Sequence, residues 1–131
     1  MHQNLTVKKT DWKNYELIDT GDGQRLEKFG DYTVVRPYPE ITWSKSQPQS
    51  VWDAADAVFI RTRGDKGRWE TKKQLPKSWP MHWQDLTATV YPSPFKHTGV
   101  FPEQSAHWDW MRQLLIEQKN SNPEYQPHVL N

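Results

Sequence analysis

The sequence predicts an α+β fold, in which a small antiparallel β-sheet or a partly open β-barrel is followed by a C-terminal helix. Short runs of β-branched and aromatic residues alternate with glycine and proline turn signals up to residue 94. After residue 101 the spacing becomes helical, with Trp108, Met111 and Leu115 on one face. The 131 residues include 8 Trp, 5 Tyr and 4 Phe, whose large rings can build the core of one such domain.

The first predicted strands lie before residue 37. Residues 15–19 alternate loosely and run into Gly21-Asp-Gly23, and an Asp-Gly pair favours the positive φ angles of a tight turn. Residues 31–36 are rich in β-branched and aromatic side chains and stop at Pro37. We therefore expect a β-hairpin around residues 21–30.

The middle of the chain indicates a helical turn and further strands. Residues 50–56 fit a short helical turn, and residues 57–61 fit a strand that leads into a turn at 64–67. Residues 68–72 should return antiparallel to that strand. Residues 86–91 form the last clear strand before a proline pair. Four or five strands at such short spacing suggest a small antiparallel sheet or a partly open barrel.

A helix of about 18 residues is predicted from Pro102, because proline suits a first helical turn and Glu103 complements the helix dipole. After it, residues 128–131 begin an apolar run that resembles the start of a strand. We therefore divide the sequence into a β-rich part, 1–94, and a part, 95–131, that holds a connecting segment, the helix and the first residues of a further domain.

Composition argues against several classes of protein. Cysteine is absent, so we expect neither disulfides nor thiolate chemistry, and a cytosolic location. No apolar run of 18 residues suggests a membrane span, and residues 1–9 lack the apolar centre of a signal peptide. The spacing of His82, His97 and His107 does not fit a zinc site, so no metal is expected.

The formal net charge of +1 conceals a basic block at residues 61–77, which holds seven basic and two acidic side chains. Such a block can neutralise the phosphates of a nucleic acid, although a solvated hairpin face is the alternative. Trp69 fits either stacking on a base or packing in the core. The candidate nucleic-acid-binding residues are Arg61, Arg63, Arg68, Trp69, Lys72 and Lys73.

Residues 95–104 place several polar side chains around Gly99 and Pro102, between a strand and a helix. Loops held between rigid elements often carry binding groups, and Gly99 lets the backbone approach a ligand closely. The same segment also fits a well-packed connection with exposed polar groups. The residues alone leave both interpretations open.

That segment, Phe95-Lys-His-Thr-Gly-Val-Phe-Pro-Glu-Gln104, followed by His107-Trp-Asp-Trp-Met111, resembles the block before the cofactor domain in a bacterial family of class I S-adenosylmethionine-dependent methyltransferases. Relatives that act on ribosomal RNA have a comparable Lys-Thr-Gly-Phe-Phe-x-Asp-Gln element. In this chain His97 is inserted, Val100 replaces an aromatic residue and Glu103 replaces aspartate. Including similar segments at 15–30, 35–37 and 67–69, the resemblance covers most of residues 12–131.

The resemblance implies that the intact protein transfers a methyl group from S-adenosylmethionine to a base, in RNA of the ribosomal kind. A Rossmann-like domain would continue after residues 129–131 and hold most cofactor contacts, so the chain alone should be inactive. No catalytic residue is assigned. The resemblance places six residues beside the cofactor or the target base: Lys96, Thr98, Gly99, Phe101, Glu103 and Gln104.

Two other classes of function stay open. A stand-alone RNA-binding module needs only the basic hairpin and the aromatic residues, without a cofactor. A protein-interaction domain would use exposed tryptophans, such as Trp69 and Trp79, as an interface with another subunit.

Overall fold

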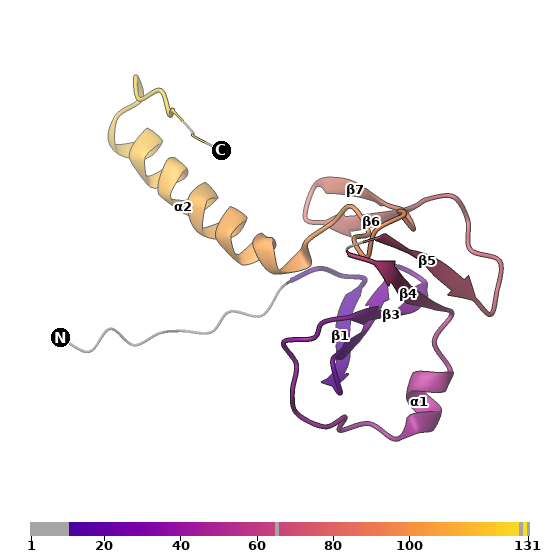
Figure 1. Ribbon diagram of the computed structural model, residues 1–131. Coiled ribbons are helices and arrows are strands. Elements are labelled where there is room, and N and C mark those ends of the chain that lie inside the picture. The colour runs from indigo at the N-terminus through magenta and orange to yellow at the C-terminus, as the bar shows by residue number, and fades with distance from the viewer. Residues whose placement is uncertain (1–10, 65, 129, 131) are drawn as a thin grey trace. The chain divides into compact units, whose positions relative to one another are not determined.

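The structure is a computed structural model that describes residues 11–64, 66–128 and 130 (Figure 1). The chain divides into two units: a β-rich unit of residues 12–101, and a helical unit that contains residues 102–128. Residues 95–101, which the sequence analysis grouped with the helix, belong to the β-rich unit.

Five strands form the main sheet, in the order β1-β2-β3-β4-β5. Neighbouring strands are antiparallel except β3 and β4, which are parallel. A parallel pair needs a long crossover, and residues 38–56, which contain helix α1 (Gln49–Asp53), provide it. The α+β class is therefore confirmed, with one parallel pair in a mainly antiparallel sheet. The strands are Tyr15–Gly21 (β1), Gln24–Phe29 (β2), Tyr32–Pro37 (β3), Ala57–Arg63 (β4) and Lys66–Thr71 (β5).

The predicted Asp-Gly turn forms, with φ of 48° at Asp22 and 73° at Gly23. The predicted hairpin was wrong in its pairing, because strand β2 lies between β1 and β3 and pairs with both. Strand β2 is hard to recognise in the sequence because it contains a charged residue at a buried position. Glu27 is 1% exposed, and its buried carboxylate breaks the alternation of polar and apolar residues that would indicate a half-buried strand.

A second sheet consists of β6 (Trp79–Trp83) and β7 (Leu86–Val90). The sequence predicted β7 and did not predict β6, which contains Pro80, a residue untypical of a strand interior. In β6, residues 79, 81 and 83 are buried and residues 80 and 82 are exposed, as expected for a strand with one face on a core.

Trp79 connects the second sheet to the main one. Its indole N–H donates a 2.8 Å hydrogen bond to the carbonyl oxygen of Phe29, and its ring lies 4.7 Å from that of Tyr32. The side chain is only 7% exposed. The expectation that Trp79 is an exposed interface residue was therefore wrong, because it packs in the core of its own chain.

The main sheet carries apolar side chains on both faces. On one face Leu26 and Val35 pack with Trp52 and Ala55 from the α1 region. Phe29 projects from the other face, because side chains alternate along a strand, and its ring meets Tyr15 edge-on at 5.2 Å. In Figure 1, α1 and the β6–β7 pair lie on opposite sides of the main sheet. Both faces of the main sheet are thus covered.

Asp19 is a buried carboxylate that fastens the crossover to β1. It accepts hydrogen bonds from the backbone N–H groups of Ser46 and Gln47, the Ser46 hydroxyl and the Trp52 indole N–H, at 2.6 to 3.1 Å. Burial alone would raise the pKa of Asp19. The hydrogen bonds stabilise the charged form more strongly and lower the pKa to about 2.

We expect the folded state to lose stability in strong acid as Asp19 is protonated. Its folded pKa lies below the unfolded value of about 3.9, so its contribution of roughly 2 kcal/mol is complete above about pH 5 and is lost as the pH falls toward 2. Urea unfolding across this pH range should show a shallower dependence for Asp19→Asn than for the wild type. The exposed Asp31→Asn is the control, and equal slopes for all three proteins would contradict the role of Asp19.

The helical unit contains a short 3-10 turn, η1 (Pro102–Gln104), and the 17-residue helix α2 (Ser105–Ser121). The predicted helix is confirmed in position and length. Beyond α2 the chain stays beside it, because Lys119 Nζ donates to the carbonyl oxygen of Tyr125 at 3.3 Å. The sequence also predicted the start of a strand at residues 128–131, but residues 129 and 131 lie outside the described residues.

No helix in the described ranges is long and apolar enough to cross a membrane.

Candidate functional site

Residues 91–101, between β7 and η1, form a loop that is closed on itself. The backbone N–H of Tyr91 donates to the carbonyl oxygen of Thr98 at 3.1 Å. Inside the loop the Ser93 hydroxyl lies 2.7 Å from the carbonyl oxygen of His97. These contacts fix the backbone of the segment that resembles the methyltransferase element.

The same loop is attached to β5. The Gly67 N–H donates to the carbonyl oxygen of Pro94 at 3.1 Å, and a backbone bridge joins Lys66 to Phe95. The indole N–H of Trp69 donates to the carbonyl oxygen of Ser93 at 2.8 Å. The loop therefore lies against the β4–β5 hairpin. From the sequence, the loop and the hairpin were interpreted as two separate candidate sites.

A buried ion pair supports the loop at Lys96. The Nε and Nη2 atoms of Arg36 each donate to a carboxylate oxygen of Glu27 at 2.8 Å, and Arg36 Nη1 donates to the Lys96 carbonyl oxygen at 3.2 Å. The two paired side chains are 4% and 1% exposed. The Tyr15 hydroxyl donates to Glu27 at 2.9 Å. Burial, and next the carboxylate charge, raise the pKa of Tyr15 well above its ordinary value, so this phenol remains a donor.

Three cations surround the ring of Tyr38. The guanidinium of Arg25 lies 3.9 Å from the ring centroid, the ammonium of Lys96 4.3 Å, and the guanidinium of Arg36 5.5 Å. Glu27 neutralises Arg36, whereas no carboxylate within residues 11–64 and 66–128 forms an ion pair with Arg25 or Lys96. The Arg25 Nε is also buried without a hydrogen-bond partner in the described chain. This side of the loop is positively charged.

Thr98 and Gly99 pack within the β-rich unit. Thr98 is 1% exposed, and its Oγ1 has no hydrogen-bond partner among the described residues. Gly99 has a φ of 86°, and a Cβ at this position would lie 2.8 Å from the ring of Tyr91. Gly99 therefore lies in close contact with Tyr91, and the predicted approach of its backbone to a ligand stays a prediction.

The other residues of the element are more accessible. Lys96 is half-buried, and Phe101 is 46% exposed, with its ring 5.4 Å from that of His97. In the helical unit Glu103 and Gln104 are exposed, and Gln104 Oε1 lies 3.2 Å from a ring nitrogen of His107. Lys96 to Phe101 thus belong to one unit, and Glu103 and Gln104 to the other.

Three of the predicted nucleic-acid-binding residues contact groups of their own chain. Arg68 pairs with Glu70 at 2.7 Å, Lys73 pairs with Asp56 at 2.9 Å, and Lys72 Nζ donates to the carbonyl oxygen of Asp53. Carboxylates of the same chain therefore partly neutralise Arg68 and Lys73, and a backbone carbonyl accepts a hydrogen bond from Lys72. Arg61 and Arg63 lie exposed on β4.

Trp69 is partly buried by its neighbours. Its ring meets that of Phe59 edge-on at 5.3 Å, and its N–H is bonded to Ser93. Trp69 was predicted either to stack on a base or to pack in the core, and its contacts in the β-rich unit are packing contacts.

A hollow beside the β4–β5 turn brings Arg63 together with Gly64, Lys66 and Phe95. Phe95 is 42% exposed, and both cations are exposed. Of these residues, only Arg63 was predicted from the sequence as a nucleic-acid-binding residue. The only sequence signal was an aromatic residue at the start of the 95–104 segment, and its position near the basic hairpin depends on tertiary packing.

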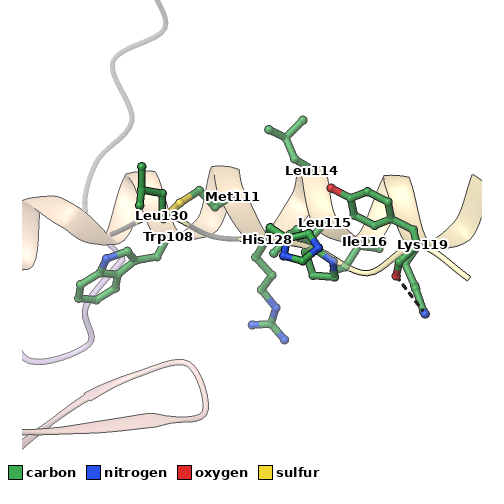
Figure 2. A pocket seen from close by; sticks show the side chains of 11 residues that line it. Trp108, Met111, Leu114, Leu115, Ile116, Lys119, His128 and Leu130 are labelled. Atoms are coloured by element: carbon green, nitrogen blue, oxygen red, sulfur yellow. Dashed lines mark hydrogen bonds between the residues drawn. The ribbon is translucent and has the colours of Figure 1, made fainter. Parts of the chain in front are cut away.

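The helical unit contains an apolar groove, which α2 and the segment after it line together (Figure 2). The predicted face of Trp108, Met111 and Leu115 contributes to it. Met111, Leu114 and Ile116 remain 39%, 40% and 51% exposed. Contiguous exposed apolar surface of this kind marks a contact with a protein, a membrane or a ligand.

The described residues contain no group of three or more His, Asp or Glu side chains arranged to hold a metal ion. No family model matches the sequence, and no curated protein matches it.

Among solved structures, the chain matches the crystal structure of a SAM-dependent methyltransferase from Agrobacterium tumefaciens, with a TM-score of 0.77 and 37% sequence identity. This chain is similar to part of a SAM-dependent methyltransferase. The match covers 86% of this chain and 36% of that protein. The methyltransferase resemblance is thus confirmed at this level, and it concerns about one third of the length of such an enzyme.

Proposed function

We propose that this chain is the N-terminal part of a class I SAM-dependent methyltransferase that modifies a base in RNA of the ribosomal kind. The observation that carries the proposal is the 37% identity over 86% of the chain to a SAM-dependent methyltransferase. The 95–104 element also supports it, since this segment resembles the block before the cofactor domain of the family, and it connects the last strand to the helix.

S-adenosylmethionine would supply the methyl group, and a further domain would hold most of it. Within the β-rich unit Thr98 is enclosed and Tyr91 occupies the space beside Gly99, so these residues alone do not form a cofactor pocket. We propose that the accessible groups of the element border the cofactor or the target base. On this proposal the 131-residue chain by itself transfers no methyl group. The accessible groups are Lys96, Phe101, Glu103 and Gln104.

Positive charge on the β-rich unit supports an RNA substrate. Arg63 and Lys66 flank the hollow at the hairpin, and Arg25 and Lys96 lie around Tyr38. Exposed cations bind phosphates largely by releasing counterions from the nucleic acid. Arg68, Lys72 and Lys73 should contribute less, because groups on their own chain already hold them.

We expect the affinity of the chain for single-stranded RNA to fall steeply between about 50 and 200 mM salt, by a logarithmic slope of roughly 0.7 per phosphate contacted. Fluorescence anisotropy with a labelled oligonucleotide measures this slope. Replacing both Arg63 and Lys66 with glutamine should reduce this slope by the equivalent of about one to two phosphate contacts. Arg68→Gln, at a cation paired with Glu70, is the matched control and should change it little. Affinity that hardly varies with salt would contradict phosphate recognition.

The apolar groove on α2 favours a second candidate function, a protein-interaction domain. In the methyltransferase proposal this groove contacts the rest of the enzyme, whereas an interaction domain would use it for another subunit. Sedimentation of the wild type and of Ile116→Gln tests the alternative. Self-association that this substitution abolishes, in a chain that binds no RNA, would favour the interaction domain.

A further inference from the structure

We propose that Phe95 is a stacking platform for an unpaired RNA base, and that Arg63 and Lys66 bind the neighbouring phosphates. The inference rests on the proposed function, because it takes RNA to be the ligand. The observation behind it is the hollow in which an exposed phenyl ring lies with two cations from the β4–β5 hairpin.

The backbone under Phe95 is held on both sides. The preceding carbonyl oxygen, of Pro94, accepts a hydrogen bond from Gly67, and Phe95 itself forms a bridge with Lys66. Its N–H donates to the Ser93 hydroxyl at 3.2 Å. The ring nevertheless keeps 42% of its surface exposed. An aromatic side chain on a fixed backbone loses little entropy on binding, which suits it to recognition.

The charges beside Phe95 are available to a ligand. Within the described ranges the side chains of Arg63 and Lys66 form neither an ion pair nor a hydrogen bond, unlike the paired Arg68 and Lys73. A Cβ at Gly64 would have no atom within 4 Å, so the hollow is open at the turn. Aromatic stacking combined with cations along the backbone is the usual way in which single-stranded nucleic acids are bound.

An exposed ring can stack only on a base whose own face is free. In a duplex the base faces are covered by their neighbours, so this site should select a loop, a bulge or a single strand. Phe95 then carries the stacking role in place of Trp69, whose N–H is bonded to Ser93 and whose ring contacts that of Phe59 inside the protein.

Anisotropy titrations of the 131-residue chain test the platform, with a labelled single-stranded RNA and the same sequence as a duplex. We expect the wild type to prefer the single strand, and Phe95→Ala to weaken single-strand binding by about tenfold, as the loss of one stacking contact implies. Phe95→Tyr should keep the affinity, whereas Phe95→Leu, which keeps apolar bulk but cannot stack, should lose it. Trp43→Ala, at an exposed aromatic outside the hollow, is the control and should bind normally.

The outcomes separate the platform from the proposed function. A wild type that binds no RNA would overturn both. RNA binding that Phe95→Leu leaves unchanged, or a preference for the duplex, would overturn the platform and leave RNA recognition standing. The leucine and tyrosine variants decide the result if the alanine variant fails to fold.

Discussion

Replacing Arg36 with methionine should lower the free energy of unfolding by about 3–5 kcal/mol, because it removes one partner of a buried ion pair. The Glu27 carboxylate would keep the hydrogen bond from Tyr15 and lose both bonds from the guanidinium. The Lys96 carbonyl would also lose its donor, so the loop of residues 91–101 should loosen. Urea unfolding followed by tryptophan fluorescence measures the loss.

A second variant isolates the buried charge. Glu27→Leu combined with Arg36→Met removes both charges and should recover much of the stability, since an apolar replacement of a buried pair is often neutral. Lys28→Met, at an exposed position on the same strand, should change stability by less than about 0.5 kcal/mol. A loss below about 1 kcal/mol for Arg36→Met would contradict the role assigned to the pair.

Replacing Trp79 with alanine should cost about 3–5 kcal/mol, the usual range for deleting a large buried ring. The ring packs against Tyr32, and its N–H is bonded to the Phe29 carbonyl oxygen. Its Cδ1 atom lies 2.9 Å from the position that a Cβ on Gly30 would take, so the sheets are in close contact there. Thermal and urea unfolding measure the effect, and the β6–β7 pair should become more accessible to proteases.

The stability loss of Trp79→Ala can be compared with the losses expected for two further variants. Trp79→Phe keeps a ring and loses the hydrogen bond, so it should cost roughly 1–3 kcal/mol. Trp110→Ala, at a residue that is 56% exposed, should cost less than about 0.5 kcal/mol. Equal stability of the Trp79→Ala and Trp110→Ala variants would contradict the placement of Trp79 in the core.

Much of the fold follows from local chemistry. Strands β3, β4 and β7 are rich in β-branched residues, and the β1–β2 turn needs positive φ angles that an Asp-Gly pair adopts easily. Strands β2 and β6 were not predicted, each for a different reason. Glu27 places a charge where an apolar residue is expected. Pro80 is tolerated because both strands of a two-stranded sheet are edge strands, where a missing N–H need not break the ladder.

The candidate site was less predictable, because its contacts join distant parts of the chain. The 95–104 element could be located from its residue pattern. Its contact with the basic hairpin, through Gly67 and Pro94, has no local signal. For the same reason the sequence could not show that Asp56 holds Lys73, or that Phe95 lies beside Arg63.

A methyl-transfer assay is the decisive test of the proposed function. The full product of the gene would be incubated with S-adenosylmethionine that carries a radioactive methyl group, and with ribosomal RNA lacking its natural methyl groups. We expect the label to enter RNA, and the 131-residue chain alone to transfer none. Label that enters only protein or a small molecule, or no transfer at all by the full product, would overturn the proposal of an RNA methyltransferase.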